Sequence, residues 1–201
     1  MADYSHDNTL VDLRSLRETL KDFTPNAEEQ YNKACNTRTD INENLPVLKE
    51  YADMCNHVTE MGSRTGQSTW ALVASKATNI VLYDINPRVG AFLEPHFICA
   101  REENKHITFT CISTISPFLE IEETDLLFID TLHTYEQLTQ ELEMHGMKAR
   151  KYLAFHDTAH PQFGEGLNKA ISEFMFSNIG VWEDAVVKEN NNGLRILKRV
   201  N

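Results

Sequence analysis

The segment at residues 58–70 (VTEMGSRTGQSTW) constrains the fold of this chain more than any other. A short β-prone run ends at Glu60, glycines follow at Gly62 and Gly66, and helix-forming sequence comes next. A strand, a glycine turn and a helix N-terminus form a site where backbone can approach a nucleotide-like ligand. The spacing is not Gly-x-Gly-x-x-Gly, and it is not a P-loop, because Gln67 stands where a P-loop has lysine. The segment predicts a ligand-binding turn, with an ordinary strand-to-helix turn as the alternative.

A second strand, predicted at residues 79–84, ends in a carboxylate. Asp84 follows Glu60 by 24 residues. An acidic residue about 20 residues after the glycine turn, at the tip of the second strand, is positioned to accept hydrogen bonds from ribose hydroxyls. The two segments together indicate a nucleoside-binding site.

Strand and helix patterns alternate along most of the chain, which predicts an α/β fold. Further strands are expected at 107–111, 125–130, 151–155, 181–188 and 194–199, and helices at 47–56, 68–75, 88–103 (interrupted by Pro95), 135–146 and 165–177. The Asn-Gly pair before the last strand predicts an antiparallel hairpin. Right-handed crossovers then favour a doubly wound, mostly parallel sheet with helices on both faces.

We expect residues 1–44 to form an N-terminal helical cap and residues 45–201 to form one domain. Apolar residues near helical spacing predict a first helix, which could face the body of the protein or a second subunit and so permits a homodimer: Leu10, Leu13, Leu16, Leu20 and Phe23. Residues 26–39 are polar and are expected to be a second short helix or a mobile cap.

Composition narrows the function. The chain has 30 acidic and 19 basic residues and a formal charge of −11, which argues against a nucleic-acid partner. The N-terminus lacks the pattern of a secretory signal, and no apolar run approaches the roughly 20 residues that cross a bilayer. We therefore expect a cytoplasmic protein without a membrane partner. The four cysteines show no Cys-x-x-Cys spacing and are interpreted as free thiols.

The predicted strand ends carry residues that can bind ligands or take part in catalysis. Ligands of such sheets bind beyond the carboxyl ends of the strands. In strand order these ends carry Glu60 and Gly62, then Asp84, then Ser113 and Thr114, then Asp130, and finally His156 and Asp157. Because crowded carboxylates cost free energy unless they are paired, hydrogen-bonded or metal-bound, this edge is the predicted binding site.

The motifs Glu-Met-Gly-Ser-Arg-Thr-Gly-Gln-Ser and Tyr-Asp-Ile-Asn-Pro resemble motifs I and II of class I S-adenosylmethionine-dependent methyltransferases, especially small-molecule O-methyltransferases. Asp130 and His156-Asp157 extend the resemblance to roughly residues 40–160. The resemblance implies a Rossmann-like sheet of seven strands in the order 3-2-1-4-5-7-6, with the seventh antiparallel. It also implies an S-adenosylmethionine site formed by Glu60, Gly62, Ser63, Gly66, Ser68, Asp84, Ser113, Thr114 and Asp130.

In that topology the fourth and fifth strands are neighbours, so Asp130, His156 and Asp157 are expected to meet. Two carboxylates and an imidazole suit a hard divalent cation, Mg²⁺ or Mn²⁺. The catechol-type, sugar and antibiotic O-methyltransferases keep a metal at these strand ends. The catechol type uses a more carboxylate-rich set, so His156 favours manganese, iron or zinc over magnesium as the bound metal here. The alternative is that His156 caps a helix or bonds Asp130, and that Asp157 is a helix N-cap.

His133 stands three residues beyond Asp130, in a loop where the resembling enzymes commonly carry a catalytic base. A neutral histidine there can take a hydroxyl proton during methyl transfer, although a loop histidine can also be a surface residue. His160 and Phe163 are candidates for the substrate rim. The predicted activity is metal-assisted methyl transfer to a hydroxyl of a small molecule. The alternatives are a non-catalytic cofactor-binding or interaction protein, and an NAD-dependent oxidoreductase, which the missing Gly-x-Gly disfavours.

Overall fold

The computed structural model describes residues 26–93, 97–102, 105–111 and 119–200. The predicted first helix, Pro95, and the site candidates Ser113 and Thr114 lie outside the described residues.

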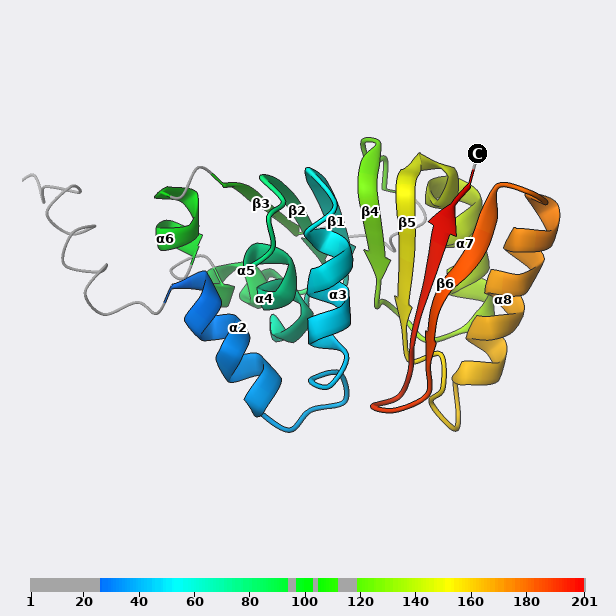
Figure 1. The fold of residues 1–201 in the computed structure, drawn as a ribbon, viewed down its shortest axis with the longest axis horizontal. Coiled ribbons are helices and arrows are strands. Elements are labelled where there is room, and N and C mark those ends of the chain that lie inside the picture. The colour runs from blue at the N-terminus through cyan, green and yellow to red at the C-terminus, as the bar shows by residue number, and fades with distance from the viewer. Residues whose placement is uncertain (1–25, 94–96, 103–104, 112–118, 201) are drawn as a thin grey trace, which may run out of the picture.

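A seven-stranded sheet runs through the middle of the molecule (Figure 1). Its strands are β1 (His57–Met61), β2 (Asn79–Asp84), β3 (His106–Cys111), β4 (Thr124–Ile129), β5 (Ala149–His156), β6 (Trp182–Lys188) and β7 (Leu194–Arg199). The strand order is β3-β2-β1-β4-β5-β7-β6, and β7 is antiparallel to both β5 and β6. The predicted order and the antiparallel seventh strand are confirmed.

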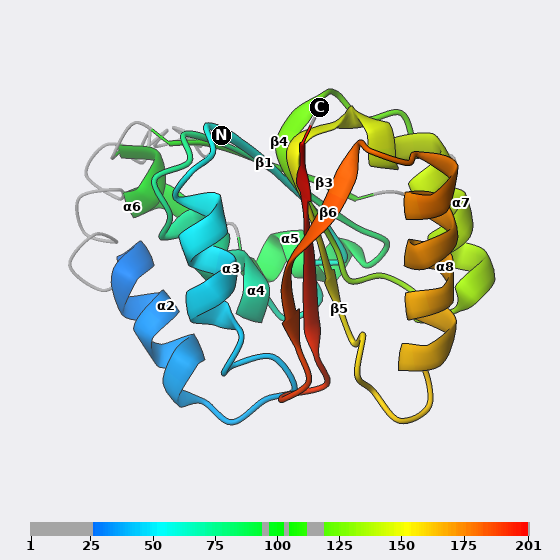
Figure 2. The same ribbon diagram turned by 45° about the vertical axis from the view of Figure 1, so that its right-hand side comes forward.

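Helices cover both faces of the sheet (Figures 1 and 2). One face packs against α2 (Ala27–Asn36), α3 (Leu45–Ala52), α4 (Gln67–Val73), α5 (Pro87–Leu93) and α6 (Phe97–Glu102). The other face packs against α7 (Tyr135–His145) and α8 (Gly164–Ser177), and a short 3₁₀ helix, η3 (Gly146–Lys148), follows α7. The helical pattern predicted at 88–103 is divided between α5 and α6, as expected for a stretch interrupted by proline.

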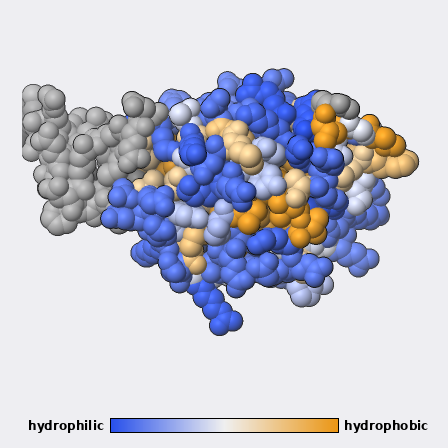
Figure 3. All heavy atoms as spheres, viewed as in Figure 1, coloured by the Kyte–Doolittle hydropathy of each residue, from blue (hydrophilic) through white to orange (hydrophobic). Residues whose placement is uncertain are grey.

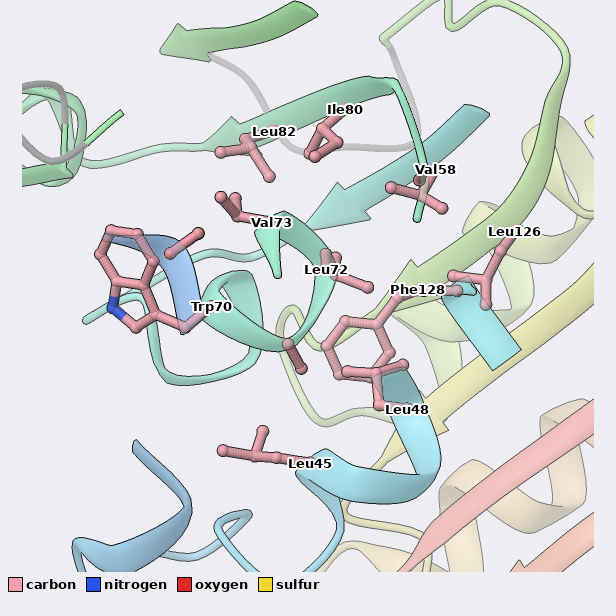
Figure 4. Close-up of a cluster of buried hydrophobic side chains, with 14 of the residues drawn as sticks. Leu45, Leu48, Val58, Trp70, Leu72, Val73, Ile80, Leu82, Leu126 and Phe128 are labelled. Atoms are coloured by element: carbon pink, nitrogen blue, oxygen red, sulfur yellow. The ribbon is translucent and has the colours of Figure 1, made fainter. Parts of the chain in front are cut away.

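The position of β4 in the sheet explains the run of apolar residues in its second half, at residues 126–129. All six of its residues are buried. Leu126 and Phe128 pack into the core on the α3 side (Figure 4), whereas Leu127 and Ile129 pack into the core on the α7 side. A parallel strand that is covered on both faces needs apolar residues at every position and not at alternate ones. Asp130, which follows the last residue of β4, therefore lies at the carboxyl edge of the sheet, between the two cores that cover its faces.

α2 forms in the polar segment for which the sequence left a helix and a mobile cap open. Asn26 and Glu29 make a reciprocal capping box, in which the Asn26 side chain accepts from the Glu29 N–H at 2.8 Å. Ala27 and Ala34 are buried in the same core cluster as α3 and α4. The helix is thus confirmed, and the division of the chain at residue 44 stays a prediction.

No helix in the described ranges is long and apolar enough to cross a membrane. The face drawn in Figure 3 is mainly hydrophilic, with small separate hydrophobic areas.

Candidate active site

The turn between β1 and α4 lies directly against the end of β4. Gly62 has φ +91°, and a Cβ atom on it would lie 2.0 Å from the backbone oxygen of Asp130. Gly66, the N-cap of α4, has φ +80°. Only glycine adopts these backbone angles without strain and also leaves room for the neighbouring chain. Gly62 therefore lets the end of β1 lie next to Asp130, whereas Gly66 lets the start of α4 lie against the Leu93 side chain.

Glu60 is the buried anchor of this turn. Its carboxylate accepts hydrogen bonds from Ser63 Oγ at 2.9 Å, Ser68 Oγ at 2.5 Å and Thr69 Oγ1 at 2.6 Å. Burial raises the pKa of Glu60 to about 7, and the three hydroxyl donors oppose that rise. In this structure Glu60, Ser63 and Ser68 thus bond to one another, and their predicted contact with a cofactor stays a prediction. Thr69 was not predicted from the sequence to belong to this site.

Asp84 lines the first of two cavities at this edge of the sheet. Its two oxygens accept from the backbone N–H groups of Arg64 and Asn86, each at 2.7 Å. The cavity has a volume of about 340 Å³. Its walls are mainly apolar and consist of Met61, Gly62, Arg64, Tyr83, Asp84, Ile85, Asp130, Thr131, Leu132 and Gln137. A mainly apolar cavity with carboxylates in its wall suits a nucleoside, because the base needs apolar walls and the ribose needs acceptors.

Two apolar wall residues were missed by the sequence analysis. Ile85 is 70 % exposed and Leu132 is 63 % exposed. Large apolar side chains with that exposure, beside an apolar cavity, indicate a surface that a ligand would cover. The only sequence signal was their position, because each follows a strand-end acid by one or two residues.

Asp130, His156 and Asp157 meet at the ends of β4 and β5, as predicted. Nδ1 of His156 lies 3.5 Å from an oxygen of Asp130 and 3.5 Å from an oxygen of Asp157. One ligand atom from each residue lies within 4.8 Å of the other two, and no other such group of three occurs in the part of the chain that the structure describes. Asp157 has φ +57°, a left-handed conformation that favours Asn and Asp over most residues.

His133 joins this cluster between the two carboxylates. Its Nε2 lies 3.1 Å from Asp130 Oδ1 and 3.0 Å from Asp157 Oδ2. These bonds raise the pKa of His133 to about 10. Burial would raise the pKa of Asp130, but hydrogen bonds from His133 and His156 outweigh it and lower that pKa to about 2. His133 is therefore protonated at neutral pH in this arrangement, whereas the sequence analysis expected a neutral base.

His156 is also held in its charged form. Burial lowers its pKa, but the neighbouring Asp130 carboxylate outweighs burial and raises the pKa to about 9. The pKa of Asp157 is lowered, because His133 and His156 overcome the opposing effect of burial. The two carboxylates thus favour the charged forms of both histidines, and the histidines favour the ionised forms of both carboxylates.

The second cavity opens over this cluster and has a volume of about 430 Å³. It is lined by Asp40, Arg64, Asp130, Thr131, Leu132, His133, Asp157, His160, Phe163 and Asn192. The rings of His160 and Phe163 are stacked with centroids 4.4 Å apart, and both predicted rim residues thus line the cavity. Asp40, Arg64 and Asn192 were not anticipated, because they come from segments far apart in the sequence. The two cavities share Asp130 and the loop that follows it.

Several solved methyltransferases share this architecture at low sequence identity. A Podospora anserina methyltransferase bound to SAH (S-adenosylhomocysteine) has a TM-score of 0.58 at 12 % identity, and the match covers 100 % of this chain and 99 % of that one. A Bacillus cereus O-methyltransferase in complex with SAH has a TM-score of 0.60 at 12 % identity, covering 95 % and 93 % of the two chains. This chain has the class I methyltransferase fold. No protein-family model and no curated protein matches the sequence.

A putative caffeoyl-CoA O-methyltransferase from Staphylococcus aureus has the same methyltransferase fold, with a TM-score of 0.59 at 12 % identity over 94 % of this chain and 92 % of that one. At such identities the likeness concerns the fold alone, and the chemistry has to be argued from this chain's own residues.

The donor set fits a divalent metal. It offers two carboxylates and one imidazole, which are the ligand types that Mn²⁺ and related ions accept. In addition, Oδ1 of Asp157 is buried and has no hydrogen-bond partner in the part of the chain described. A buried carboxylate oxygen without a partner carries a desolvation cost that a bound cation would remove. The metal-ligand prediction for Asp130, His156 and Asp157 is therefore chemically consistent with this methyltransferase fold.

Proposed function

We propose that this protein transfers a methyl group from S-adenosylmethionine to a hydroxyl group of a small molecule, assisted by a divalent metal. The observation that carries the proposal is the pair of adjoining cavities that share Asp130. One cavity is mainly apolar and is lined by Asp84, and the other is lined by His133 and by Asp130 and Asp157 of the predicted metal-ligand cluster. A methyl donor and an acceptor would then meet beside Asp130.

The cofactor would be held by the first cavity. Asp84 would accept the ribose hydroxyls, and Ile85 and Leu132 would cover the base. The SAH-bound structures with the same fold support this assignment. Methyl transfer is an in-line displacement, so the main contribution of the protein would be the proximity and orientation of the two substrates.

Asp130, His156 and Asp157 would hold the metal, which we propose to be Mn²⁺ or Mg²⁺. When bound, such an ion lowers the pKa of an acceptor hydroxyl that coordinates it. The imidazole favours Mn²⁺ or a similar transition ion over Mg²⁺, which prefers oxygen ligands.

His133 would serve as the base that receives the hydroxyl proton. Its raised pKa comes from the two carboxylates that bond its Nε2. If Asp130 and Asp157 held a cation, they would no longer be free to accept from the imidazole, and the pKa of His133 would lie nearer its ordinary value. A neutral His133 in the wall of the acceptor cavity could then accept a proton.

The rival functions use the same fold without this chemistry. A non-catalytic cofactor-binding protein would bind S-adenosylhomocysteine and transfer nothing. An NAD-dependent oxidoreductase is less well supported, because the Gly62 turn lacks the Gly-x-Gly spacing of dinucleotide sites. A homodimer and a cytoplasmic location stay predictions.

The test is an assay of S-adenosylhomocysteine release from purified protein with S-adenosylmethionine and a panel of small hydroxyl compounds. We expect release with a subset of acceptors, loss of release after chelation, and recovery with Mn²⁺ or Mg²⁺. Asp157→Asn should require more metal for half-maximal release. Full turnover after exhaustive chelation would contradict the metal-assisted mechanism, and cofactor binding without release for any acceptor would favour the non-catalytic alternative.

A further inference from the structure

The ring nitrogen of His156 that is not near the carboxylate cluster, Nε2, is hydrogen-bonded to the backbone. Nε2 lies 3.0 Å from the backbone oxygen of Asp40 and 3.2 Å from that of Asn191. Backbone carbonyls only accept hydrogen bonds, so Nε2 must carry the proton and donate it. In the neutral ring the lone pair then belongs to Nδ1, the atom that faces Asp130 and Asp157.

The two carbonyls come from segments that are bound to each other. We call residues 39–44 and 190–193 the clasp. The Asn191 side chain accepts from the Glu43 N–H at 2.9 Å and donates to the Thr39 carbonyl at 3.0 Å. From the other side, the buried Asn44 amide donates to the carbonyls of Asn190 and Asn191 at 3.1 and 3.3 Å. The Asn191 side chain thereby holds the 39–44 segment against its own turn.

The backbone of the 190–193 turn is restricted by its φ angles and by its packing against the loop after β5. Asn191, Asn192 and Gly193 all have positive φ, at 54°, 63° and 91°. A Cβ atom on Gly193 would lie 2.4 Å from the backbone nitrogen of Ala159, and that nitrogen donates to the Asn192 carbonyl at 2.7 Å. The loop after β5 therefore packs on the turn, which leaves little freedom in the direction of the Asn191 carbonyl.

We propose that Asn191 is a positioning residue for the metal site, because the clasp fixes His156 so that Nδ1, and not Nε2, is the metal ligand. This inference rests on the metal-assisted function proposed above. It assigns a role to a hairpin whose turn sequence is otherwise explained by strand pairing alone. Partners that orient the second nitrogen of a ligating histidine fix its tautomer and raise its affinity for the ion.

The first test removes the side chain and keeps the backbone. Asn191→Gly tolerates positive φ but loses the bonds to Thr39 and Glu43. We expect Mn²⁺ affinity, measured by calorimetry with the ion alone, to fall about 10- to 100-fold. Glu189→Ala is the matched control, since it changes an exposed residue just outside the clasp and should leave Mn²⁺ affinity unchanged. Asn191→Asp, which keeps the acceptor and loses the donor, should fall between the two and serves if the glycine variant does not fold.

The second test reads the ligand atom directly. With ¹⁵N-histidine labelling and diamagnetic Zn²⁺, the His156 Nδ1 resonance should shift on metal binding while Nε2 stays protonated. His156→Asn, whose oxygen reaches the Nδ1 position, should keep more Mn²⁺ affinity than His156→Gln, whose oxygen reaches the Nε2 position. Metal bound through Nε2, or Asn191→Gly with the wild-type Mn²⁺ affinity, would overturn the role of the clasp and leave the metal-assisted function standing. A protein that binds neither Mn²⁺ nor Zn²⁺ would overturn both.

Discussion

His156 and Asp130 lie directly across from each other at the ends of neighbouring parallel strands, with His156 Nδ1 3.5 Å from a carboxylate oxygen of Asp130. The register of the sheet produces this contact, because Ile129 pairs with Phe155 and the next residue of each strand completes the pair. Two groups that would be costly alone in the interior are thus brought together by the strand order. The candidate chemistry of this chain is concentrated at that one junction.

Glu60 should stabilise the turn after β1 more than a surface acid would. Glu60→Ala leaves the hydroxyls of Ser63, Ser68 and Thr69 without their acceptor, and we expect it to lower the free energy of unfolding by about 1–3 kcal/mol in urea titrations. Glu183→Ala, which changes an exposed acid on β6, is the control and should shift it by less than about 0.5 kcal/mol. Equal effects of the two substitutions would contradict the bracing role of Glu60.

The histidine–carboxylate cluster should make the metal-free protein less stable at high pH. The pKa values of His133 and His156 are raised from 6.5 to about 10 and about 9, so their contribution is fully present below about pH 6.5. It is lost as the pH rises through those raised values, since the folded state then gives up its extra protons. The pKa of Asp130 is lowered to about 2, so its contribution is present above its ordinary 3.8 and is lost as the pH falls toward 2.

Urea unfolding with chelator present should therefore show a decline in stability between pH 7 and 10 that is smaller in Asp130→Asn. NMR titration of the two histidines gives the same information for each ring. If both histidines titrate near pH 6.5 in the metal-free protein, the proposed effect of the carboxylates on the pKa values of His133 and His156 is wrong.

Substitution of His133 should lower turnover without loss of metal binding, whereas substitution of a metal ligand should weaken metal binding. His133→Ala should lower turnover by about 10²- to 10⁴-fold, the usual contribution of a general base, while Mn²⁺ affinity is kept. The affinity is expected to rise slightly, because the substitution removes a cation that competes for Asp130 and Asp157. His106→Ala, at the exposed start of β3, is the control. Loss of bound Mn²⁺ in His133→Ala would reassign this histidine as a ligand.

Much of this arrangement could be predicted from the sequence because parallel strands end at one edge of a sheet. Apolar runs that stop at Glu60, Asp84, Asp130 and His156 place those residues together once the strand order is known. The fold and the meeting of Asp130, His156 and Asp157 depend on such local patterns.

The remaining features depend on contacts between distant residues. The Asp40 carbonyl reaches His156 across 116 positions, and the Asn191 carbonyl reaches it across 35. No periodicity or motif marks a backbone carbonyl as a partner. The bonds of Ser63, Ser68 and Thr69 to Glu60 were not predicted, although Ser63 and Ser68 were named for the cofactor site, and the exposed Ile85 and Leu132 were missed. The role of these residues appears only when the turn and the cavity are formed.

The central claim is that the cavity at the ends of β1, β2 and β4 binds S-adenosylmethionine. Calorimetric titration of the wild-type protein with S-adenosylhomocysteine and with NAD⁺ tests it most directly, with Asp84→Ala as the variant and Glu183→Ala as the control. We expect S-adenosylhomocysteine to bind in preference to NAD⁺, Asp84→Ala to weaken that binding by about 1.5–3 kcal/mol through loss of charge-assisted hydrogen bonds, and Glu183→Ala to bind normally. Tight binding of NAD⁺ with no heat from S-adenosylhomocysteine would contradict the account.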